Sequence, residues 1–508
     1  MRKYPIGIQD FKEVREGGYL YVDKTRSIHT LIESGKYYFL SRPRRFGKSL
    51  LLSTIKEIFS GSKELFQGLW IGDNWNWDQQ RPVIHLRFSQ MAYKELGLSE
   101  AINRELDTVA KGFDVLLEAD NVKEKFRELI RKVAAKGKVV ILIDEYDKPV
   151  IDYLDDLPKA QENRSIFKSF YSVLKDADEY IHFLIITGVS KFTQVSIFSD
   201  LNNLNDITLH PKYTTLVGIT QQELEDNFLQ EIEEMRQSTP DILQEIKEWY
   251  NGYSWHDGKV TVYNPFSLLR FMEAGVFQNF WFATGTPTFL VEQIRKRGDF
   301  QFEGLRMGDL GLGNFDIERI APVPLLFQTG YLTIKSYDQR SRIYELDYPN
   351  REVKSSLLEA LLSSYREVFS GDSGALTSSL RDALQSNDIP KVVEVLNALI
   401  ATIPYDHWQA DKESIFHIII HLTFKLLGVE VDSEVHSAGG RCDAIVQTST
   451  HIYVIEFKLD ESAQKAVDQI REKNYLQPYQ ADKRKKTAIG INFSSEDRKI
   501  KDYLVKEL

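Results

Sequence analysis

Short apolar runs alternate with amphipathic stretches between residues 36 and 208 of this chain. Strands that are apolar at almost every position are typical of parallel sheets, which helices cover on both faces. The runs lack the regular polar alternation of a half-exposed sheet, so we predict buried strands. These strands cover residues 37–40, 82–88, 139–143 and 181–186. The pattern therefore predicts an α/β unit with a parallel sheet and helices on both faces.

The pattern changes twice further along the chain. From about 215 to 400, apolar residues recur at three- and four-residue spacing, which predicts a mostly helical region. Its clearest helical segments are 221–235 and 353–369, and the turn-rich segment 251–266 predicts a hairpin that leads into another helix. After residue 405 we predict a smaller α/β unit, with a helix at 411–427, strands around 429–435, 441–446 and 452–457, and a helix from about 462. We therefore expect three parts, at 1–214, 215–400 and 401–508.

Composition narrows the class of protein. The chain has 508 residues, and single cores rarely exceed about 250–300 residues, so several domains are expected. No apolar run approaches the ~18 residues of a membrane span, and the first residues lack the apolar segment of a secretory signal. The lone cysteine, Cys442, excludes an intramolecular disulfide and a cysteine-rich zinc site. We expect a cytoplasmic protein.

The net charge of −10 disfavours a protein that coats nucleic acid without specificity. Contacts to nucleic acid would have to come from local basic clusters. Three such clusters are present: Arg42, Arg44, Arg45 and Lys48; Arg295, Lys296 and Arg297; Lys483, Arg484, Lys485 and Lys486. For the last two, a solvated surface is the ordinary interpretation.

The segment 41–49, SRPRRFGKS, lies between a predicted strand and a predicted helix. A phosphate cradle needs backbone N–H groups at a helix N-terminus, a lysine, and a hydroxyl for magnesium. Gly47, Lys48 and Ser49 supply the end of such a cradle, with the lysine and the hydroxyl. Arg42 occupies the position of the usual first glycine, and Pro43 removes one N–H donor. A coincidental Gly-Lys-Ser at a helix start is the competing interpretation.

A second motif favours the phosphate site. The apolar run at 139–143 ends in Asp144, Glu145 and, after a tyrosine, Asp147. Phosphoryl-transfer ATPases place an acid there to hold magnesium and a glutamate beside it to orient the attacking water. The two motifs together predict ATP and Mg²⁺ as cofactors, with Ser49 and Asp144 at the metal and Glu145 as a catalytic residue. Thr187, at the end of the fourth predicted strand, is a candidate sensor of the γ-phosphate or a simple strand-end cap.

With these residues in view, the first 210 residues resemble the AAA-ATPase-like family of bacteria and some archaea. The matching motifs are Tyr4–Gly7, Tyr21–Thr25, Arg42–Ser49, Leu142–Asp147 and Gly188–Phe192. The resemblance makes the Arg-Pro-Arg-Arg stretch part of the family's own loop, so that it no longer counts against nucleotide binding. It implies a nucleotide-binding set of Arg44, Arg45, Phe46, Gly47, Lys48, Ser49, Leu50, Asp144 and Thr187. It also implies a homo-oligomer.

The C-terminal candidates are Asp443, Glu456 and Lys458. Residues two apart in a strand face the same way, so Glu456 and Lys458 project together, and a neighbouring strand could bring Asp443 opposite them. Two carboxylates suit Mg²⁺, and a lysine can orient or deprotonate a metal-bound water. Glu413 on the preceding helix and Gln469 on the following helix complete the candidate catalytic set.

This set resembles the core of the PD-(D/E)XK nuclease superfamily, over about residues 405–508. The resemblance implies a metal-dependent nuclease that is regulated by ATP and acts on DNA more than RNA, with defence or mobile-element control as the expected context. Cys442 is interpreted as a small buried residue, and His417 and His421 as core or helix-surface residues with zinc as the alternative. Two other hypotheses stay open: a nucleotide-dependent switch that grips nucleic acid or a protein without cutting, and an inert loop that serves as a scaffold.

Overall fold

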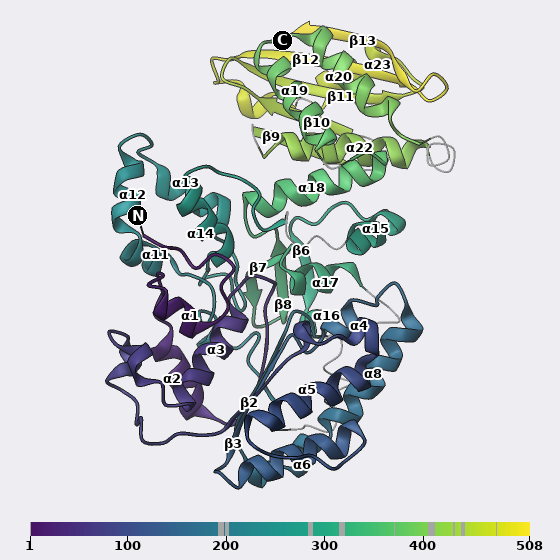
Figure 1. Cartoon of the computed structure of the whole chain (residues 1–508). Helices are drawn as coiled ribbons and strands as arrows, with labels where there is room; N and C mark the ends of the chain where they lie inside the picture. Colours follow the sequence, from purple (N-terminus) through teal and green to yellow (C-terminus); the bar gives the residue numbers. More distant parts are fainter. Residues whose placement is uncertain are drawn as a thin grey trace. The chain divides into compact units, whose positions relative to one another are not determined.

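The computed structural model describes residues 2–191, 198, 203–282, 288–313, 321–369, 371–404, 412–429, 432–437, 442–473 and 475–508, without the side chains of 288–289, 310, 313, 412–413, 432–437 and 442–443. The chain forms two compact units (Figure 1). The first contains Met1–Gly285 and Phe302–Glu352, and the second contains Thr286–Gln301 and Val353–Leu508. The expected middle region, 215–400, is thus divided between them.

The first unit is built on a five-stranded parallel sheet with the order β2-β3-β4-β1-β5. Its strands are β1 (Tyr37–Ser41), β2 (Val83–Arg87), β3 (Val139–Asp144), β4 (Ile181–Gly188) and β5 (Asn205–Asp206). The four predicted strands are confirmed, and β5 is an addition. Because β4 lies between β1 and β3, its carboxyl end lies beside the ends of both strands.

Helices cover this sheet on both faces, as the apolar strands predicted (Figure 1). They are α1 (Phe11–Glu16), α2 (Thr25–Ser34), α3 (Lys48–Phe59), α4 (Tyr93–Leu96), α5 (Leu98–Gly112), α6 (Val122–Ala134), α7 (Lys148–Ile151), α8 (Leu157–Tyr171) and α9 (Val173–Asp176). All positions of β1 and β3 are buried. Short 3-10 turns at Lys63–Phe66, Trp70–Gly72, Phe88–Gln90, Asp178–Tyr180 and Pro211–Tyr213 connect the elements.

The region after residue 215 is largely helical, as predicted, but it also contains a small sheet. The helices are α11 (Gln221–Asn227), α12 (Leu229–Arg236), α13 (Ile242–Tyr250), α14 (Pro265–Ala274), α15 (Thr288–Arg297), α16 (Asp309–Gly313) and α17 (Pro322–Thr329). Three antiparallel strands, β6 (Leu305–Gly308), β7 (Thr333–Asp338) and β8 (Ile343–Asp347), form the unpredicted sheet in the order β6-β8-β7. The predicted hairpin is present as an antiparallel bridge between Tyr253 and Val262.

One predicted helix, 221–235, is two helices that meet at Phe228. The backbone of this residue leaves the helical region, with φ −127° and ψ 22°. Its ring is buried and stacks on the ring of Tyr4 at a centroid distance of 5.9 Å. The same cluster holds Leu20, Ile219 and Leu268. Packing against the N-terminal segment therefore breaks the helix and joins this part of the middle region to the first unit.

The second unit is built on a five-stranded mixed sheet with the order β13-β12-β11-β10-β9. Its strands are β9 (Asp432–Ser437), β10 (Cys442–Gln447), β11 (His451–Leu459), β12 (Lys485–Ser494) and β13 (Lys499–Glu507). Strands β11 and β12 are parallel, and the other neighbours are antiparallel. The first three strands were predicted from the sequence; β12 and β13 were not.

Helices α18 (Arg351–Arg366), α19 (Asp372–Gln385), α20 (Ile389–Ala401), α22 (Lys412–Leu427) and α23 (Ala463–Glu472) complete the second unit, with a 3-10 turn at Gln477–Tyr479. The chain passes from the first unit into the second within the first turn of α18, after Glu352. Within the described ranges, no helix is both long enough and apolar enough to cross a bilayer.

Candidate functional site

The loop between β1 and α3 turns sharply at two residues with positive φ. Arg45 has φ +68°, and Gly47 has φ +89° in the left-handed region that favours glycine. The helix then begins at Lys48, whose side chain is buried. Its Nζ donates to the carbonyl oxygens of Arg42 at 2.8 Å and Pro43 at 2.9 Å. The lysine therefore folds back over its own loop.

Electrostatics at this lysine suit an anion. Burial lowers the pKa of Lys48, and the carboxylates of Glu145 and Asp144 oppose that shift. Among the described residues, the hydrogen-bond partners of the ammonium are the two neutral carbonyl oxygens. A buried cation held in this way gains strongly from a charged acceptor such as phosphate. Ser49, the next residue, lies in the first turn of α3 and is half-buried.

Arg42, at the position of the usual first glycine, is not part of a basic surface patch. Its guanidinium is buried and donates to the carbonyl oxygens of Ser41 and Thr208, both at 2.8 Å, and of Tyr213 at 3.3 Å. It also lies over the ring of Trp255 at 4.5 Å. Burial lowers the pKa of Arg42 to about 9. The side chain therefore ties the end of β1 to the later segment that holds Thr208 and Tyr213.

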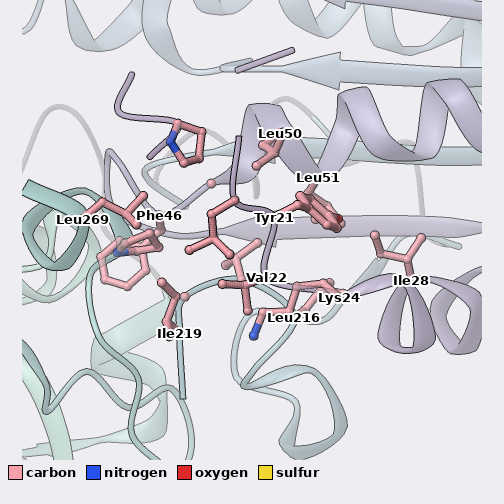
Figure 2. Close-up of a pocket in the computed structure, with 16 residues that line it drawn as sticks. Tyr21, Val22, Lys24, Ile28, Phe46, Leu50, Leu51, Leu216, Ile219 and Leu269 are labelled. Atoms are coloured by element: carbon pink, nitrogen blue, oxygen red, sulfur yellow. The ribbon is translucent and has the colours of Figure 1, made fainter. Parts of the chain in front are cut away.

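Residues 44–46 of the loop differ in their burial. Arg44 and Arg45 are exposed. Phe46 is fully buried, with its ring edge-on to Tyr253 at 4.8 Å and to Trp255 at 5.5 Å. The structure thus places Phe46 as an anchor of the loop and leaves the two arginines accessible. Leu50 follows in the first turn of α3, is half-buried, and lines with Phe46 a pocket beside the loop (Figure 2).

The acidic end of β3 meets the end of β4. The hydroxyl of Thr187 donates to Oδ1 of Asp144 at 2.6 Å, and both residues are buried. Glu145, the next residue, has φ +52°, so the backbone turns out of the strand at this point. The structure therefore brings together Asp144 and Thr187, which sequence reasoning named separately, beside the loop that holds Lys48.

Asp147, the third acid of the motif, holds the loop after β4. Its Oδ2 accepts from the backbone N–H groups of Val189 at 3.0 Å and Ser190 at 2.7 Å, and from the Ser190 hydroxyl at 2.8 Å. Burial raises the pKa of Asp147, and the hydrogen bonds from Ser190 oppose that shift. Gly188 permits this approach, because a Cβ there would lie 2.5 Å from the Tyr146 ring. In the sequence, the signal for these hydrogen bonds is the presence of a third acid, Asp147, two residues after Glu145.

The C-terminal candidates lie on β11 and α23. Nζ of Lys458 donates to Oε1 of Glu456 at 2.9 Å and to Oε1 of Gln469 at 2.7 Å. Glu456 is fully buried, and the Lys458 side chain is 11% exposed. The three residues that the sequence separates by up to 13 positions therefore form one hydrogen-bonded group. Lys473, which follows the last residue of α23, is exposed and lies over the Tyr475 ring.

The remaining predicted members are placed only by their backbones. The antiparallel register of β10 and β11 pairs Asp443 directly with Glu456. Directly opposed residues of such a pair share a face of the sheet. Glu413 lies in the first turn of α22. The side chains of Glu413, Asp443 and Cys442 lie outside the described part of the structure.

A glycine decides where α23 lies. Gly490 of β12 pairs with Glu456 in parallel register. A Cβ at position 490 would lie 2.4 Å from the carbonyl oxygen of Ala463, at the start of α23. The backbone N–H of Ala463 also donates to Asp502 at 2.9 Å. Helix α23 therefore rests directly on the sheet and carries Gln469 to the lysine. The sequence offered no signal that singled out Gly490.

Oxygen donors dominate both sites, as a magnesium ion requires. The metal candidates of the sequence analysis carry such donors: Ser49 and Asp144 in the first unit, and Glu456 and Asp443 in the second, where the Asp443 side chain is not described. Among the described side chains, no three His, Cys, Asp or Glu residues gather as a metal-binding group. His421 is buried with its ring against Phe300 at 5.1 Å.

The order β2-β3-β4-β1-β5, with a Gly-Lys-Ser loop after β1 and acids after β3, defines a P-loop NTPase unit. The mixed sheet with Glu456 and Lys458 defines a PD-(D/E)XK-type unit. Comparison with known proteins agrees with both assignments. A family described as Predicted AAA-ATPase matches residues 5–198, and the PD-(D/E)XK nuclease superfamily matches residues 411–503.

A curated relative extends the match to the whole chain. It is "Uncharacterized protein in vnfD 5'region" of Azotobacter chroococcum mcd 1, which is 39% identical over 524 residues, or 100% of this chain and 99% of the relative. The chain belongs to the family of this protein, an AAA-ATPase-like family with a C-terminal PD-(D/E)XK nuclease superfamily domain. No solved structure matches the chain.

Proposed function

We propose that this protein binds and hydrolyses ATP in its first unit and thereby regulates a metal-dependent phosphodiesterase in its second unit, with DNA as the preferred substrate over RNA. One observation carries the proposal: Lys458 lies within hydrogen-bond distance of both Glu456 and Gln469. This arrangement keeps a lysine, an acid and an amide together in a buried place of a nuclease-family domain. An ordinary surface ion pair has both side chains in solvent, whereas Glu456 in this pair is fully buried.

In the ATP site, Gly47, Lys48 and Leu50 bind the phosphates through the start of α3, with Arg44 and Arg45 at the exposed side of the loop. Lys48 exchanges its two carbonyl partners for phosphate oxygens, which carry more charge. Ser49 and Asp144 hold magnesium, and Thr187 orients Asp144 through its 2.6 Å hydrogen bond. Glu145 orients the attacking water.

In the nuclease site, Glu456 and Asp443 hold a divalent cation, with Glu413 as a further carboxylate. The bound ion supplies Lewis acidity and lowers the pKa of water. Lys458 orients the attacking water and stabilises negative charge that builds on the phosphate. Gln469 is a positioning residue, because it contacts Lys458 and fixes its ammonium beside Glu456.

A route for regulation begins at the nucleotide loop. Nε1 of Trp281 donates to the carbonyl oxygen of Arg44 at 3.2 Å, and its backbone N–H donates to Oε1 of Glu352 at 2.7 Å. Glu352 lies in the first turn of α18, and the chain enters the second unit at the next residue. A change in the loop on ATP binding therefore reaches α18 through one tryptophan.

The test is a magnesium and ATP titration of cleavage of supercoiled, linear and single-stranded DNA, and of RNA, by the full chain. We expect cleavage that needs magnesium and whose rate changes with ATP. Binding of nucleic acid without cleavage at any metal concentration would favour the non-cutting switch instead. Unchanged ATP turnover after Asp144→Asn would favour a loop that serves only as a scaffold.

A further inference from the structure

Strand β13 forms one edge of the sheet in the second unit (Figure 1). It is nine residues long and pairs with β12 on one side. Near its start the pairing shifts register, and the backbone N–H of Ile500 donates to Oδ1 of Asn397 on α20 at 2.7 Å. From Lys501 onward, no described residue outside β12 hydrogen-bonds to the backbone of the strand. A long edge strand of this kind is a template for pairing with another strand.

The pairing with β12 decides which backbone groups of β13 face away from the sheet. The N–H of Leu508 donates to the carbonyl oxygen of Lys486 on β12 at 2.9 Å. In an antiparallel pair, alternate residues direct both backbone groups to the same neighbour. Leu504 therefore faces β12, as Leu508 does, and the residues next to it face away. The edge thus offers the N–H and C=O groups of Tyr503 and Val505 to a further strand.

The side chains of this edge form a pattern that is complementary to itself, with Leu504 at its centre. Tyr503 and Val505 flank the centre, and they are 42% and 38% exposed. Oppositely charged residues stand at equal distances beyond them on the two sides. The pairs at one, two and three residues from the centre are Tyr503 and Val505, Asp502 and Lys506, and Lys501 and Glu507.

A second copy of the same strand fits this pattern. On a two-fold axis through Leu504, an antiparallel copy brings each residue opposite its counterpart. Each charged residue then meets an opposite charge, and Tyr503 meets Val505. Opposite charges, and aromatic residues opposed to β-branched ones, stabilise antiparallel pairs. Tyr503 and Val505 also have the outward backbone groups, so they form the hydrogen-bonded pairs of the new ladder.

The neighbouring registers lose this match. A centre at Tyr503 places Lys501 opposite Val505, and a centre at Val505 places Glu507 opposite Tyr503. Both registers leave charged side chains opposite apolar ones. The charges therefore favour one register, and the same charges disfavour pairing with unrelated strands.

We propose that two copies of this chain associate through β13, as antiparallel neighbours centred on Leu504, so that their sheets continue into one another. Because the same edge serves both copies, the interface closes on itself. The two-fold axis is perpendicular to the sheet, so helix α23 of each copy lies on the same face of the joined sheet. The pairing involves neither of the two candidate sites, and it is independent of the proposed function.

The charged side chains of the edge can make these contacts. The two lysines of the pattern have no ion-pair partner among the described residues. Glu507 lies 3.5 Å from Nζ of Lys485, but both side chains are exposed, and such a pair contributes little. Asp502 accepts from Nδ2 of Asn492 at 2.7 Å and from the N–H of Ala463 at 2.9 Å. A carboxylate keeps further acceptor positions for a lysine.

Single cysteines on the full chain measure the register. At the two-fold axis, Leu504 faces its own copy with about 4.5 Å between the Cα atoms, a distance that a disulfide spans. Under mild oxidation, Leu504→Cys should therefore form a crosslinked dimer about tenfold faster than Tyr503→Cys or Val505→Cys. Wild type, with Cys442 alone, gives the background. Fastest crosslinking at one of the other two positions would overturn the register, and no crosslinking above background in any variant would overturn the interface.

Sedimentation equilibrium of the full chain without nucleotide measures the dissociation constant of the dimer. Glu507→Lys places a like charge opposite Lys501 at both ends of the interface, so the dissociation constant should rise about tenfold. Adding Lys501→Glu restores both charge pairs and should return the constant to within about twofold of wild type. Glu496→Lys makes the same charge change at an exposed residue in the turn before β13 and should have no effect.

The reversal and its rescue decide the matter even if one cysteine variant fails to fold. A wild type that stays monomeric at every concentration would overturn the proposal. A dimer that Glu507→Lys leaves unchanged would place the interface elsewhere and overturn it as well. Failure of the second reversal to restore association would show that the two charges do not face each other, which would overturn the register.

Discussion

The two sites each hold a buried or nearly buried lysine, but the partners of the two lysines differ. Lys48 donates to two neutral backbone carbonyl oxygens. Lys458 donates to the carboxylate of Glu456 and the amide of Gln469. A cation held by neutral acceptors favours an incoming anion. A cation already paired with an acid leaves the site near neutrality, which suits a metal ion and its water.

This difference predicts that removal of each lysine side chain lowers a different property of the protein. Under the proposed function Lys48 serves binding, so its loss should act on nucleotide affinity. Under the same proposal Lys458 serves the chemical step, so its loss should act on cleavage. Changes at the two lysines test that distinction, and changes at Gly490 and Glu352 test contacts that support the two sites, in order from the largest expected effect to the smallest.

Lys458→Ala should reduce cleavage by about 1,000-fold or more, because it removes a group that stabilises charge on the phosphate. It should also destabilise the fold by about 3–5 kcal/mol, since it removes the cation next to buried Glu456. Initial rates and thermal unfolding measure the two effects. Lys465→Ala, on the exposed side of α23, is the control. Lys458→Arg should recover stability without recovering cleavage, and full activity in Lys458→Ala would contradict the assignment.

Lys48→Ala should weaken ATP binding by about 100-fold, because a charge-assisted contact to phosphate is lost. Cleavage in the absence of ATP should not change. Calorimetry with ATP and a cleavage assay without it provide the measurements. Lys56→Ala, in the last turn of the same helix, is the control. If Lys48→Ala lowered nucleotide-independent cleavage as strongly as ATP binding, the division of roles between the two lysines would be wrong.

Gly490→Ala should lower cleavage by about tenfold, because a Cβ 2.4 Å from the Ala463 carbonyl oxygen displaces α23 and with it Gln469. ATP affinity should stay the same. Gly112→Ala, where a Cβ would meet nothing within 4 Å, is the control. Equal cleavage by both variants would show that the position of α23 does not govern the site.

Glu352→Gln should remove a pH dependence of stability. Burial raises the pKa of Glu352 from 4.5 to about 7, a shift worth about 3 kcal/mol. Between these pH values the folded state binds more protons than the unfolded state, so stability should fall as pH rises from 4.5 to 7.

Unfolding of wild type and Glu352→Gln across pH 4.5–8 measures the difference between them. The variant should show a smaller decline over that interval. A parallel decline in both proteins would assign the pH dependence to other groups. The effect of ATP on cleavage should also weaken in the variant above pH 7, because an amide then replaces the ionised carboxylate that accepts the hydrogen bond from the Trp281 N–H.

The local patterns carried much of the prediction. The strands predicted at 37–40 and 139–143 were visible because every position in these two runs is apolar or aromatic. The pairing of Glu456 with Lys458 followed from the two-residue repeat of a strand, and the Gly-Lys-Ser loop followed from its place between a strand and a helix. Roles for individual site residues beyond these positions remain predictions for the experiments above.

Contacts between distant segments decided the rest. The sequence by itself determined the four main strands of the first sheet, the largely helical character of the middle region and the order of the charged motifs, because those patterns repeat over a few residues. Only the tertiary structure placed Thr187 beside Asp144, buried Arg42, broke the helix at Phe228 and set α23 on Gly490. Each of these depends on close approach between residues far apart in the chain, which short-range periodicity does not encode.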